Sequence, residues 1–261
     1  MRERAQQEFI NVAAHELRTP IQPIISLSGV LLQRIKDGEN HELIDVISRS
    51  AKRLQRLSHD ILDVTQIESG LLRLNKERFD LKQVISNTVD DYRNQIKNSR
   101  RNIGLVYVLD KKETKEGGGD VGARQEQLYS PLQIEDNNKI LIEADKGRII
   151  QVVDNLLSNA LKFTNEGTIS ISVERKDGQV VVVNVKDNGQ GIHSSILPKL
   201  FTKFASKSQT GGTGLGLFIS KNIIEAHGGK IWAENNADSR GATFSFSLPL
   251  TDNNPNPKSM K

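Results

Sequence analysis

The first part of the chain repeats apolar residues at steps of three and four, which is the spacing of an amphipathic helix. Two such runs, residues 9–35 and 43–71, are separated by turn formers at residues 36–40. The second run alternates the two steps, as a coiled-coil seam does. The seam consists of Leu43, Ile47, Ser50, Leu54, Leu57, Ile61, Val64 and Leu71. A hairpin of two helices cannot bury both stripes alone, so we predict that residues 1–75 dimerise into a four-helix bundle; the alternative is that the stripe is the internal core of a monomer.

From about Lys76 onwards, shorter helices alternate with strands. Helices are predicted at residues 81–96, 149–163 and within 213–227, and strands at 103–109, 168–175, 180–186, 230–234 and 243–248. The pair Asp177-Gly178 predicts a hairpin between two of these strands. The pattern therefore predicts an α+β protein, with a helical hairpin followed by a second domain over residues 76–250. The charged, glycine-rich residues 111–136 are expected to be a flexible insertion, and residues 251–261 an unstructured tail.

Composition narrows the classes of function. The chain has 261 residues, no cysteine and a formal net charge of +4, which excludes disulfide frameworks, thiol nucleophiles and thiolate metal sites. Its basic residues are dispersed and 5% of its residues are aromatic, so we expect no nucleic-acid partner. No apolar run approaches the roughly 18–20 residues of a membrane helix, and no secretory signal is present, so we expect a cytoplasmic location. Because the chain starts inside a helical pattern, we favour either a fragment whose upstream sensor or membrane region is missing or a chain that lacks a sensor module of its own.

His15 lies opposite Leu17 on the first predicted helix, on the side that faces water. A solvent-facing imidazole is close to half neutral at cytoplasmic pH, and the neutral ring is a competent nucleophile. Glu16 is adjacent, and Pro20 and Pro23 bend the helix just after the histidine because each removes a backbone donor. From its position alone, His15 would be interpreted as an ordinary solvated side chain. The motifs in the rest of the chain favour a reactive histidine instead.

Asn155, Asn159 and Lys162 share one face of the helix predicted at residues 149–163, because they are spaced at i, i+4 and i+7. Amide oxygens and an ammonium group on one stripe suit a phosphate chain together with Mg²⁺, which takes oxygen ligands and retains waters. The alternative is a polar face that serves solubility alone. The opposite face is apolar and predicted to be core: Val152, Val153, Leu156, Leu157 and Leu161.

A loop of turn formers, residues 187–191, follows the valine-rich strand predicted at residues 180–186. One interpretation is a plain turn, since Asp, Asn and Gly favour turns. The functional interpretation gives Asp187 a buried carboxylate that accepts the exocyclic amine of adenine, with Gly189 and Gly191 letting the backbone approach the nucleotide.

A second glycine segment, residues 211–217, opens a predicted helix, where free N–H groups and the helix dipole favour phosphate. Between the two glycine loops lie Phe201 and Phe204. These aromatic residues are either core or the anchors of a mobile lid over the nucleotide.

Taken in order, these motifs resemble the H, N, G1, F and G2 boxes of the two-component sensor histidine kinases. The resemblance extends from Phe9 to Leu250 except for residues 111–136. It implies a dimerisation and histidine phosphotransfer domain at residues 1–75. It also implies a catalytic ATP-binding domain at residues 76–250, an α/β sandwich of the gyrase/Hsp90/kinase/MutL type with a mixed sheet packed on helices.

The resemblance also implies roles for individual residues. His15 is the phosphoacceptor, Glu16 the base or orienting carboxylate, and Thr19 helps to place water when the partner is dephosphorylated. ATP and Mg²⁺ are the cofactors, with Asn159 as the principal metal ligand and Asn155 nearby. The remaining nucleotide-site residues it implies are Lys162, Phe163, Asp187, Gly189, Gly191, Gly212, Gly214 and Gly216.

A sensor histidine kinase phosphorylates its own histidine and passes the phosphoryl group to an aspartate on the receiver domain of a response regulator. The resemblance therefore implies a homodimer with a response regulator as partner. Two other classes of protein fit the sequence less well. An ATPase or chaperone-like machine usually carries a catalytic carboxylate where Asn155 stands. A non-enzymatic scaffold is disfavoured by four intact residues: His15, Glu16, Asn159 and Asp187. Thr19 is compatible with a protein that acts mainly as a kinase and with one that acts mainly as a phosphatase.

Overall fold

The computed structural model of the chain describes residues 21–35, 38–97, 101–109, 139–205, 213–237 and 240–250. Two compact units form: residues 1–73 with 206–219, and residues 74–205 with 220–261. Within the described ranges, no helix is long and apolar enough to cross a bilayer. Of the residues singled out above, several lie outside the described residues: His15, Glu16, Thr19, Gly212, the insertion at 111–136 and the tail at 251–261.

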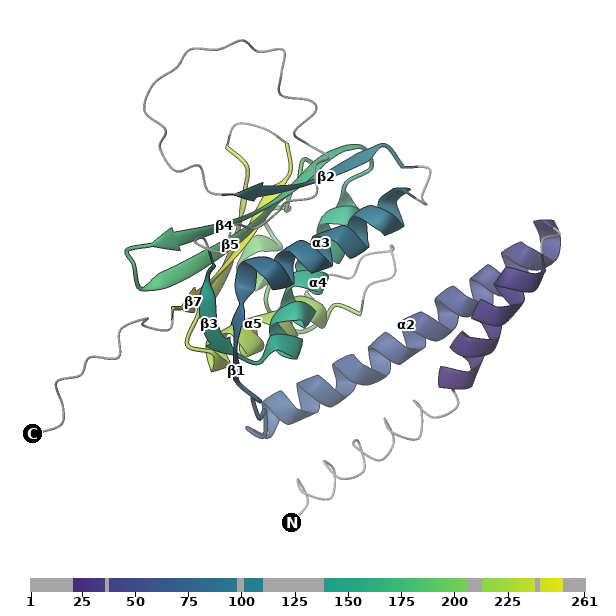
Figure 1. Cartoon of the computed structure of the whole chain (residues 1–261), viewed down its shortest axis with the longest axis horizontal. Coiled ribbons are helices and arrows are strands. Elements are labelled where there is room, and N and C mark those ends of the chain that lie inside the picture. Colours follow the sequence, from purple (N-terminus) through teal and green to yellow (C-terminus); the bar gives the residue numbers. More distant parts are fainter. Residues whose placement is uncertain are drawn as a thin grey trace, which may run out of the picture. The chain divides into compact units, whose positions relative to one another are not determined.

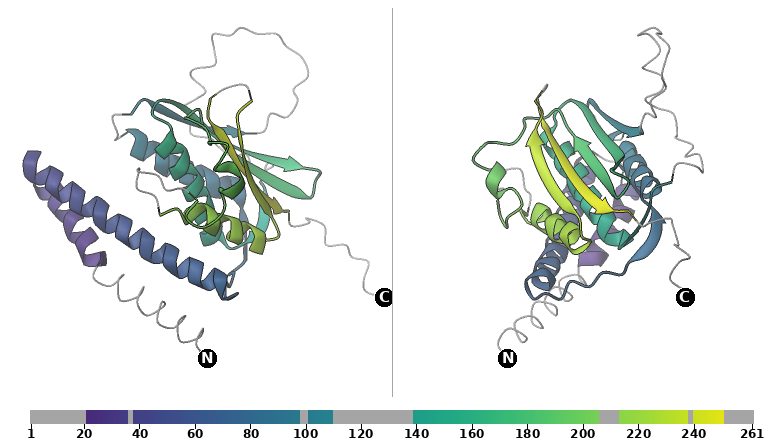
Figure 2. Two further views of the ribbon diagram at one scale, coloured as in Figure 1. Left: turned by 180° about the vertical axis from the view of Figure 1, so that it is seen from behind. Right: turned by 90° about the vertical axis from the view of Figure 1, so that its left-hand side faces the viewer.

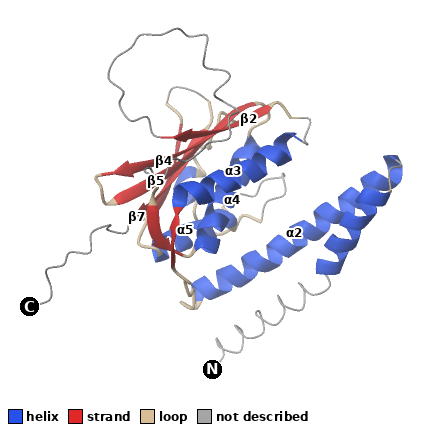
Figure 3. Cartoon of the chain, in the orientation of Figure 1, coloured by secondary structure: helices blue, strands red, loops and turns tan. Residues whose placement is uncertain are grey.

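The first unit contains a helical hairpin (Figures 1 and 3). Residues 21–34 are helical and run beside α2, Gly38–Glu68, with the side-chain amides of Gln55 and Gln22 hydrogen-bonded at 2.8 Å. Helix α2 begins inside the predicted turn, because Gly38 to Asn40 are already helical. Ile21, Ile44 and Ala51 are buried. Five residues of the predicted seam are instead 36–58% exposed and so are not an internal core of this hairpin: Leu43, Ile47, Leu54, Leu57 and Ile61.

The second unit is built on a five-stranded sheet in the order β2-β4-β5-β7-β6. Its strands are β2 (Ile103–Leu109), β4 (Gly167–Lys176), β5 (Val180–Lys186), β6 (Lys230–Asn235) and β7 (Ala242–Pro249). Strand β2 runs parallel to β4 while the other neighbours are antiparallel, so the sheet is mixed, as predicted. Helices α3 (Leu81–Lys97), α4 (Lys146–Phe163) and α5 (Gly216–Ala226), the last of which belongs to this unit from Ser220 onwards, lie against one face (Figure 2). The predicted packing of a mixed sheet on helices is confirmed.

The turn between β4 and β5 has the chemistry that the sequence predicted. Asp177 and Gly178 both adopt positive φ, 53° and 67°, and the Gln179 N–H donates to the Lys176 carbonyl at 3.3 Å. Two consecutive left-handed residues match the right-handed twist of the paired strands. The Asp-Gly pair therefore fixes the register of the hairpin.

A separate two-stranded sheet was missed by the sequence analysis. It pairs β1 (Glu77–Asp80) with β3 (Leu141–Ala144) in antiparallel register, from Glu77 opposite Ala144 to Asp80 opposite Leu141. Each strand has only four residues, too few for a clear alternation of apolar and polar positions.

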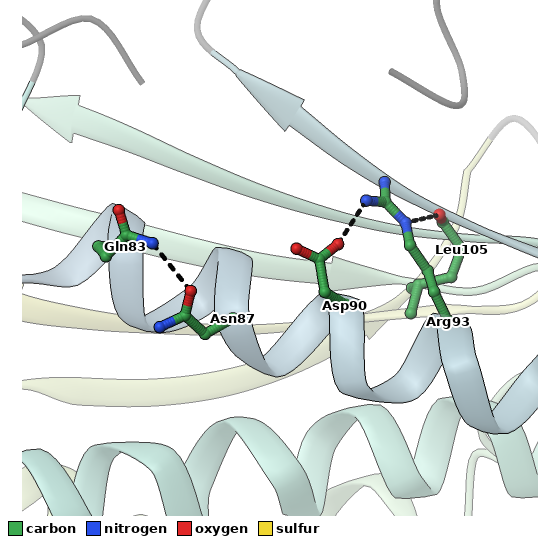
Figure 4. A network of polar contacts seen from close by, with 5 residues as sticks. All are labelled: Gln83, Asn87, Asp90, Arg93 and Leu105. Atoms are coloured by element: carbon green, nitrogen blue, oxygen red, sulfur yellow. Dashed lines mark hydrogen bonds and ion pairs between the residues drawn. The ribbon is translucent and has the colours of Figure 1, made fainter. Parts of the chain in front are cut away.

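Arg93 connects helix α3 to the edge strand β2 by a hydrogen bond (Figure 4). The Arg93 Nε donates to the Leu105 carbonyl at 3.1 Å, and its Nη1 pairs with the Asp90 carboxylate at 2.9 Å. One turn back along the helix, the Gln83 and Asn87 side chains are hydrogen-bonded at 2.8 Å. These polar contacts lie along one side of α3, while Leu81, Val84, Ile85 and Val89 are buried.

The apolar face predicted for α4 is confirmed as core. Val152, Val153, Leu156 and Leu157 have no exposed surface, and only Leu161, in the last turn, is half-buried. Helix α4 contacts β5, whose Val181, Val182, Val183 and Val185 are also buried. This packing fixes the rotation of α4 and therefore the direction of its polar face.

Candidate functional site

The polar face of α4 carries the first part of the site. Asn155, Asn159 and Lys162 are each half-buried there. The Nδ2 of Asn155 donates to the Ser220 hydroxyl on α5 at 2.9 Å, which leaves Oδ1 as its acceptor. The Lys162 ammonium lies 5.0 Å from the centroid of the Phe163 ring, within the range of a cation–π contact.

Asp187 follows the central strand β5 and is 5% exposed. Its Oδ1 accepts the backbone N–H groups of Gly189 at 2.9 Å and Ala242 at 3.3 Å. Its own backbone N–H donates to the Ala242 carbonyl at 2.9 Å. The carboxylate is therefore held in one orientation by backbone groups on both sides.

The pKa of Asp187 lies above its ordinary value because burial disfavours the charged form. The hydrogen bonds from Gly189 and Ala242 oppose that shift and stabilise the carboxylate. A buried carboxylate with a fixed orientation is a selective acceptor for a ligand amine.

Gly189 brings the Asp187 loop against the end of α4. A β-carbon at Gly189 would collide with the carbonyl oxygen of Phe163, the last residue of the helix. Only glycine permits this approach of two backbones. The structure therefore brings the predicted α4 residues and the predicted Asp187 loop together in one unit.

The second glycine segment is described only in part. Gly214 adopts a φ of 71° and Gly216 begins α5, as the sequence predicted for a loop that opens a helix. Both belong to the first compact unit, whereas Gly189 and Gly191 belong to the second.

Phe204 is not a core residue. It is 62% exposed and adopts a φ of 57°, which is uncommon for an aromatic residue. Phe201 is half-buried. The sequence left two interpretations of these aromatic residues, core packing or anchors of a lid. The structure rules out core packing for Phe204.

Three residues around the site were not singled out from the sequence. Asn235 and Asn236 hydrogen-bond to the loop at residues 187–192, and His227 hydrogen-bonds to the backbone of Asp145, the N-cap of α4. The sequence pattern gave Asn235 and Asn236 no role and placed His227 only at the end of a predicted helix. Their partners come from distant parts of the chain, so no local pattern signals them.

The ligand atoms on this face of α4 suit a magnesium ion that also binds a phosphate chain. Within the described residues, no three His, Cys, Asp or Glu side chains gather into a cluster. Asn155 and Asn159 supply amide oxygens on a half-buried face instead. Mg²⁺ commonly takes few protein ligands and completes its shell with phosphate oxygens and water, so the residues fit it.

Chemically, the second unit can recognise a purine amine with Asp187 and can neutralise phosphate charge with Lys162. Charge neutralisation and positioning are the main needs of phosphoryl transfer.

Two family models match the chain. The model of the histidine kinase-, DNA gyrase B- and HSP90-like ATPase matches residues 144–252. The model of the His Kinase A phospho-acceptor domain matches residues 5–70.

The chain is also similar to curated proteins. It is 33% identical over 255 residues to the circadian input-output histidine kinase CikA of Synechococcus elongatus, covering 94% of this chain and 30% of CikA. It is 29% identical to the sensory/regulatory protein RpfC of Xanthomonas campestris pv. campestris, covering 96% of this chain and 32% of RpfC. The chain thus spans about a third of the length of these relatives.

Solved structures agree. ShkA in complex with AMPPNP has a TM-score of 0.67 over 94% of this chain and 46% of ShkA; at 23% identity it supports the fold alone. The complex of histidine kinase ThkA with the response regulator TrrA has a TM-score of 0.56 at 28% identity, over 96% of this chain and 64% of that chain. The ThkA catalytic domain is 30% identical, with a TM-score of 0.52 over 68% of this chain and 97% of that domain. With both domain models matched in order and this domain covered almost entirely, the chain belongs to the histidine kinase family.

Proposed function

We propose that this chain binds ATP with Mg²⁺ in its second unit and transfers the γ-phosphoryl group to His15. The observation that carries this proposal is the close approach of Gly189 to Phe163, which sets the loop with the buried Asp187 carboxylate against the end of α4, the helix that carries Asn155, Asn159 and Lys162. Base recognition and phosphate neutralisation then come from adjoining segments of one rigid fold.

In the proposed mechanism, Asp187 accepts the exocyclic amine of adenine and Lys162 neutralises the phosphates. Asn159, with Asn155 nearby, would hold Mg²⁺, which supplies further charge neutralisation when bound. Gly191, Gly212, Gly214 and Gly216 are proposed to shape the pocket and its lid.

The neutral imidazole of His15 attacks the γ-phosphorus in line. An N–P bond forms as the bond to the β,γ-bridging oxygen breaks, and ADP leaves with that electron pair. Glu16 accepts a hydrogen bond from the other ring nitrogen and stabilises the charge that develops there.

We further propose that the phosphoryl group passes from His15 to an aspartate of a response regulator and that Thr19 helps to place the water that later hydrolyses the aspartyl phosphate. The solved complex of ThkA with TrrA supports this class of partner. We also propose a division at about residue 75, with a phosphotransfer domain before it and a catalytic domain after it. The two family models fall on either side of that boundary.

A homodimer is proposed because the seam of α2 is exposed in the single chain. Apolar side chains that recur along one face of a helix need a partner surface. A second copy of the same hairpin supplies one with the same spacing.

The direct test is phosphate transfer from γ-labelled ATP with Mg²⁺, comparing the parent chain with His15→Gln. We expect a label that is acid-labile, alkali-stable and absent from the variant. Asn159→Ala should lose the label while His15 remains in place. A parent chain that binds ATP but takes up no label would favour the scaffold instead.

A further inference from the structure

Two adjacent asparagines reach the loop that carries Asp187. Asn235 is the last residue of β6, and its Oδ1 accepts the Ile192 N–H at 2.6 Å while its Nδ2 donates to the Ile192 carbonyl at 2.8 Å. Asn236 donates from Nδ2 to the backbone carbonyl of Asp187 at 2.7 Å. The first and last residues of the loop at 187–192 are therefore both held by this pair.

Asn236 is itself fixed by the turn between β6 and β7. Its backbone N–H donates to the Gly241 carbonyl at 3.1 Å, and its Oδ1 accepts the Thr243 hydroxyl at 2.7 Å. The Nδ2 group is also 3.1 Å from the Arg240 carbonyl. Because both ends of its amide are engaged, Asn236 presents Nδ2 to Asp187 in one orientation.

Gly241 closes the same contact from the backbone side. It adopts a φ of 101°, and a β-carbon there would collide with the Asp187 carbonyl oxygen. Its neighbour Ala242 exchanges two hydrogen bonds with Asp187, one of them to the carboxylate. The β6–β7 turn and the Asp187 loop therefore interlock.

We propose that Asn235 and Asn236 are positioning residues for base recognition: they fix the loop so that Asp187 offers its Oδ2 oxygen to the ligand base in one geometry. Oδ1 already accepts two backbone hydrogen bonds, and Oδ2 accepts none from the described residues. The inference rests on the proposed function of ATP binding, which it deepens.

The consequence is selectivity for adenine over guanine. Adenine presents an amine to the carboxylate, whereas guanine presents a carbonyl oxygen at the same position of the ring and repels it. A carboxylate held in one orientation enforces this difference between the two bases. In a loosened loop, the Asp187 carboxylate can turn away from the guanine carbonyl and so escape the repulsion. Loss of the hydrogen bonds from Asn235 and Asn236 to the loop should therefore weaken adenine binding more than guanine binding.

The test uses the full chain and calorimetric titration with AMPPNP or GMPPNP in the presence of Mg²⁺. We expect Asn236→Ala and Asn235→Ala each to weaken AMPPNP binding about five- to tenfold, the loss expected for one or two hydrogen bonds, and to narrow the preference over GMPPNP. In autophosphorylation, KM for ATP should rise by the same factor while kcat at saturating ATP stays unchanged.

Asn184→Ala is the matched control. Asn184 also makes two side-chain hydrogen bonds within the same sheet, to Ser172 and Ser245, but contacts neither Asp187 nor Ile192 among its described partners. It should lower the melting temperature without changing either nucleotide affinity. Asn235→Asp keeps the acceptor for the Ile192 N–H and loses the donor, so it should retain part of the AMPPNP affinity.

Two results would overturn the inference. The first is that both alanine variants bind AMPPNP with the affinity and the base preference of the parent. The second is that Asn184→Ala loses as much AMPPNP affinity as they do, which would attribute the effect to general destabilisation. A parent chain that fails to bind AMPPNP would overturn the proposed function as well, so the two failures are distinguishable.

Discussion

The His227 Nε2 accepts a hydrogen bond from the backbone N–H of Asp145 at 2.9 Å, while its Nδ1 lies 2.8 Å from the Ile223 carbonyl. A backbone N–H can only donate and a carbonyl can only accept, so the ring is neutral with its proton on Nδ1. Asp145 in turn caps α4 by accepting the Arg148 N–H and accepts the Asn75 N–H through Oδ2. One buried imidazole thus joins the end of α5 to the start of α4.

This neutral ring predicts a loss of stability in acid. Burial lowers the pKa of His227 below its ordinary value of 6.5; Lys76 adds to that shift, while the Ile223 carbonyl and Asp145 oppose it. Below about pH 6.5 the unfolded chain therefore binds a proton that the folded chain resists. The free energy of unfolding should be independent of this group at higher pH and should fall as the pH drops.

Urea unfolding of the parent and of His227→Gln between pH 7.5 and 5 measures this effect. Glutamine cannot titrate, so the variant should show a shallower acid slope. His41→Gln is the control, because His41 is exposed. Equal slopes in the parent and His227→Gln would contradict the assignment.

Asp187→Asn should separate stability from binding. The raised pKa of Asp187 means that its charged form is disfavoured by folding, so the carboxylate lowers the stability of the fold at pH values well above its ordinary pKa of 3.8. Asparagine keeps an oxygen for the Gly189 and Ala242 N–H groups but removes the charge. We expect a higher melting temperature at pH 7 together with at least tenfold weaker AMPPNP binding, measured by thermal unfolding and calorimetry. A variant that binds as well as the parent would remove Asp187 from base recognition.

Gly189→Ala should damage the site through the collision of its β-carbon with the Phe163 carbonyl. Forcing two backbones apart costs on the order of 1–3 kcal/mol, as overpacking does. We expect a loss of stability in that range, seen by chemical denaturation, and a larger relative loss of nucleotide affinity. Gly147→Ala is the control, because a β-carbon there meets only the Asp145 Oδ1 at an ordinary 3.5 Å. Within a helix that change should be neutral or stabilising by up to about 1 kcal/mol.

Leu54→Glu should separate the proposed dimer. Leu54 is 44% exposed in the single chain and lies in the predicted seam, where two copies would bury a carboxylate without a partner. Sedimentation should show a monomer that still binds AMPPNP, because the nucleotide residues of the second unit are unchanged. Arg53→Glu alters the charge at the neighbouring position outside the seam and should remain dimeric. A chain that is monomeric before mutation would refute the bundle.

The regular elements of the second unit were largely predictable. Strands β2 and β5 match their predicted ranges, and the others differ by one or two residues at their ends. The period of two and the Asp-Gly turn are local signals, so one sequence suffices to read them. Strands β1 and β3 were missed because their pairing joins residues more than sixty positions apart, and neither is long enough to show a period.

The site divides in the same way. Asp187 and the polar face of α4 were predicted because their chemistry lies in one loop and one helix. Asn235, Asn236 and His227 were not, since each acts through a hydrogen bond to a distant element. His15, Glu16 and Thr19 lie outside the described residues and stay predictions.

The position of β5 at the centre of the sheet has a consequence for how ligand binding is detected. Both neighbouring strands pair with β5 over its whole length, Val180–Lys186, so its amides are shielded on either side. Such amides exchange with solvent only when the whole unit unfolds. The loop with Asp187 follows directly from that strand, so the surface proposed to contact the base is already formed before a ligand arrives. Protection from exchange that appears on nucleotide binding should therefore be concentrated away from β5, in segments that open locally.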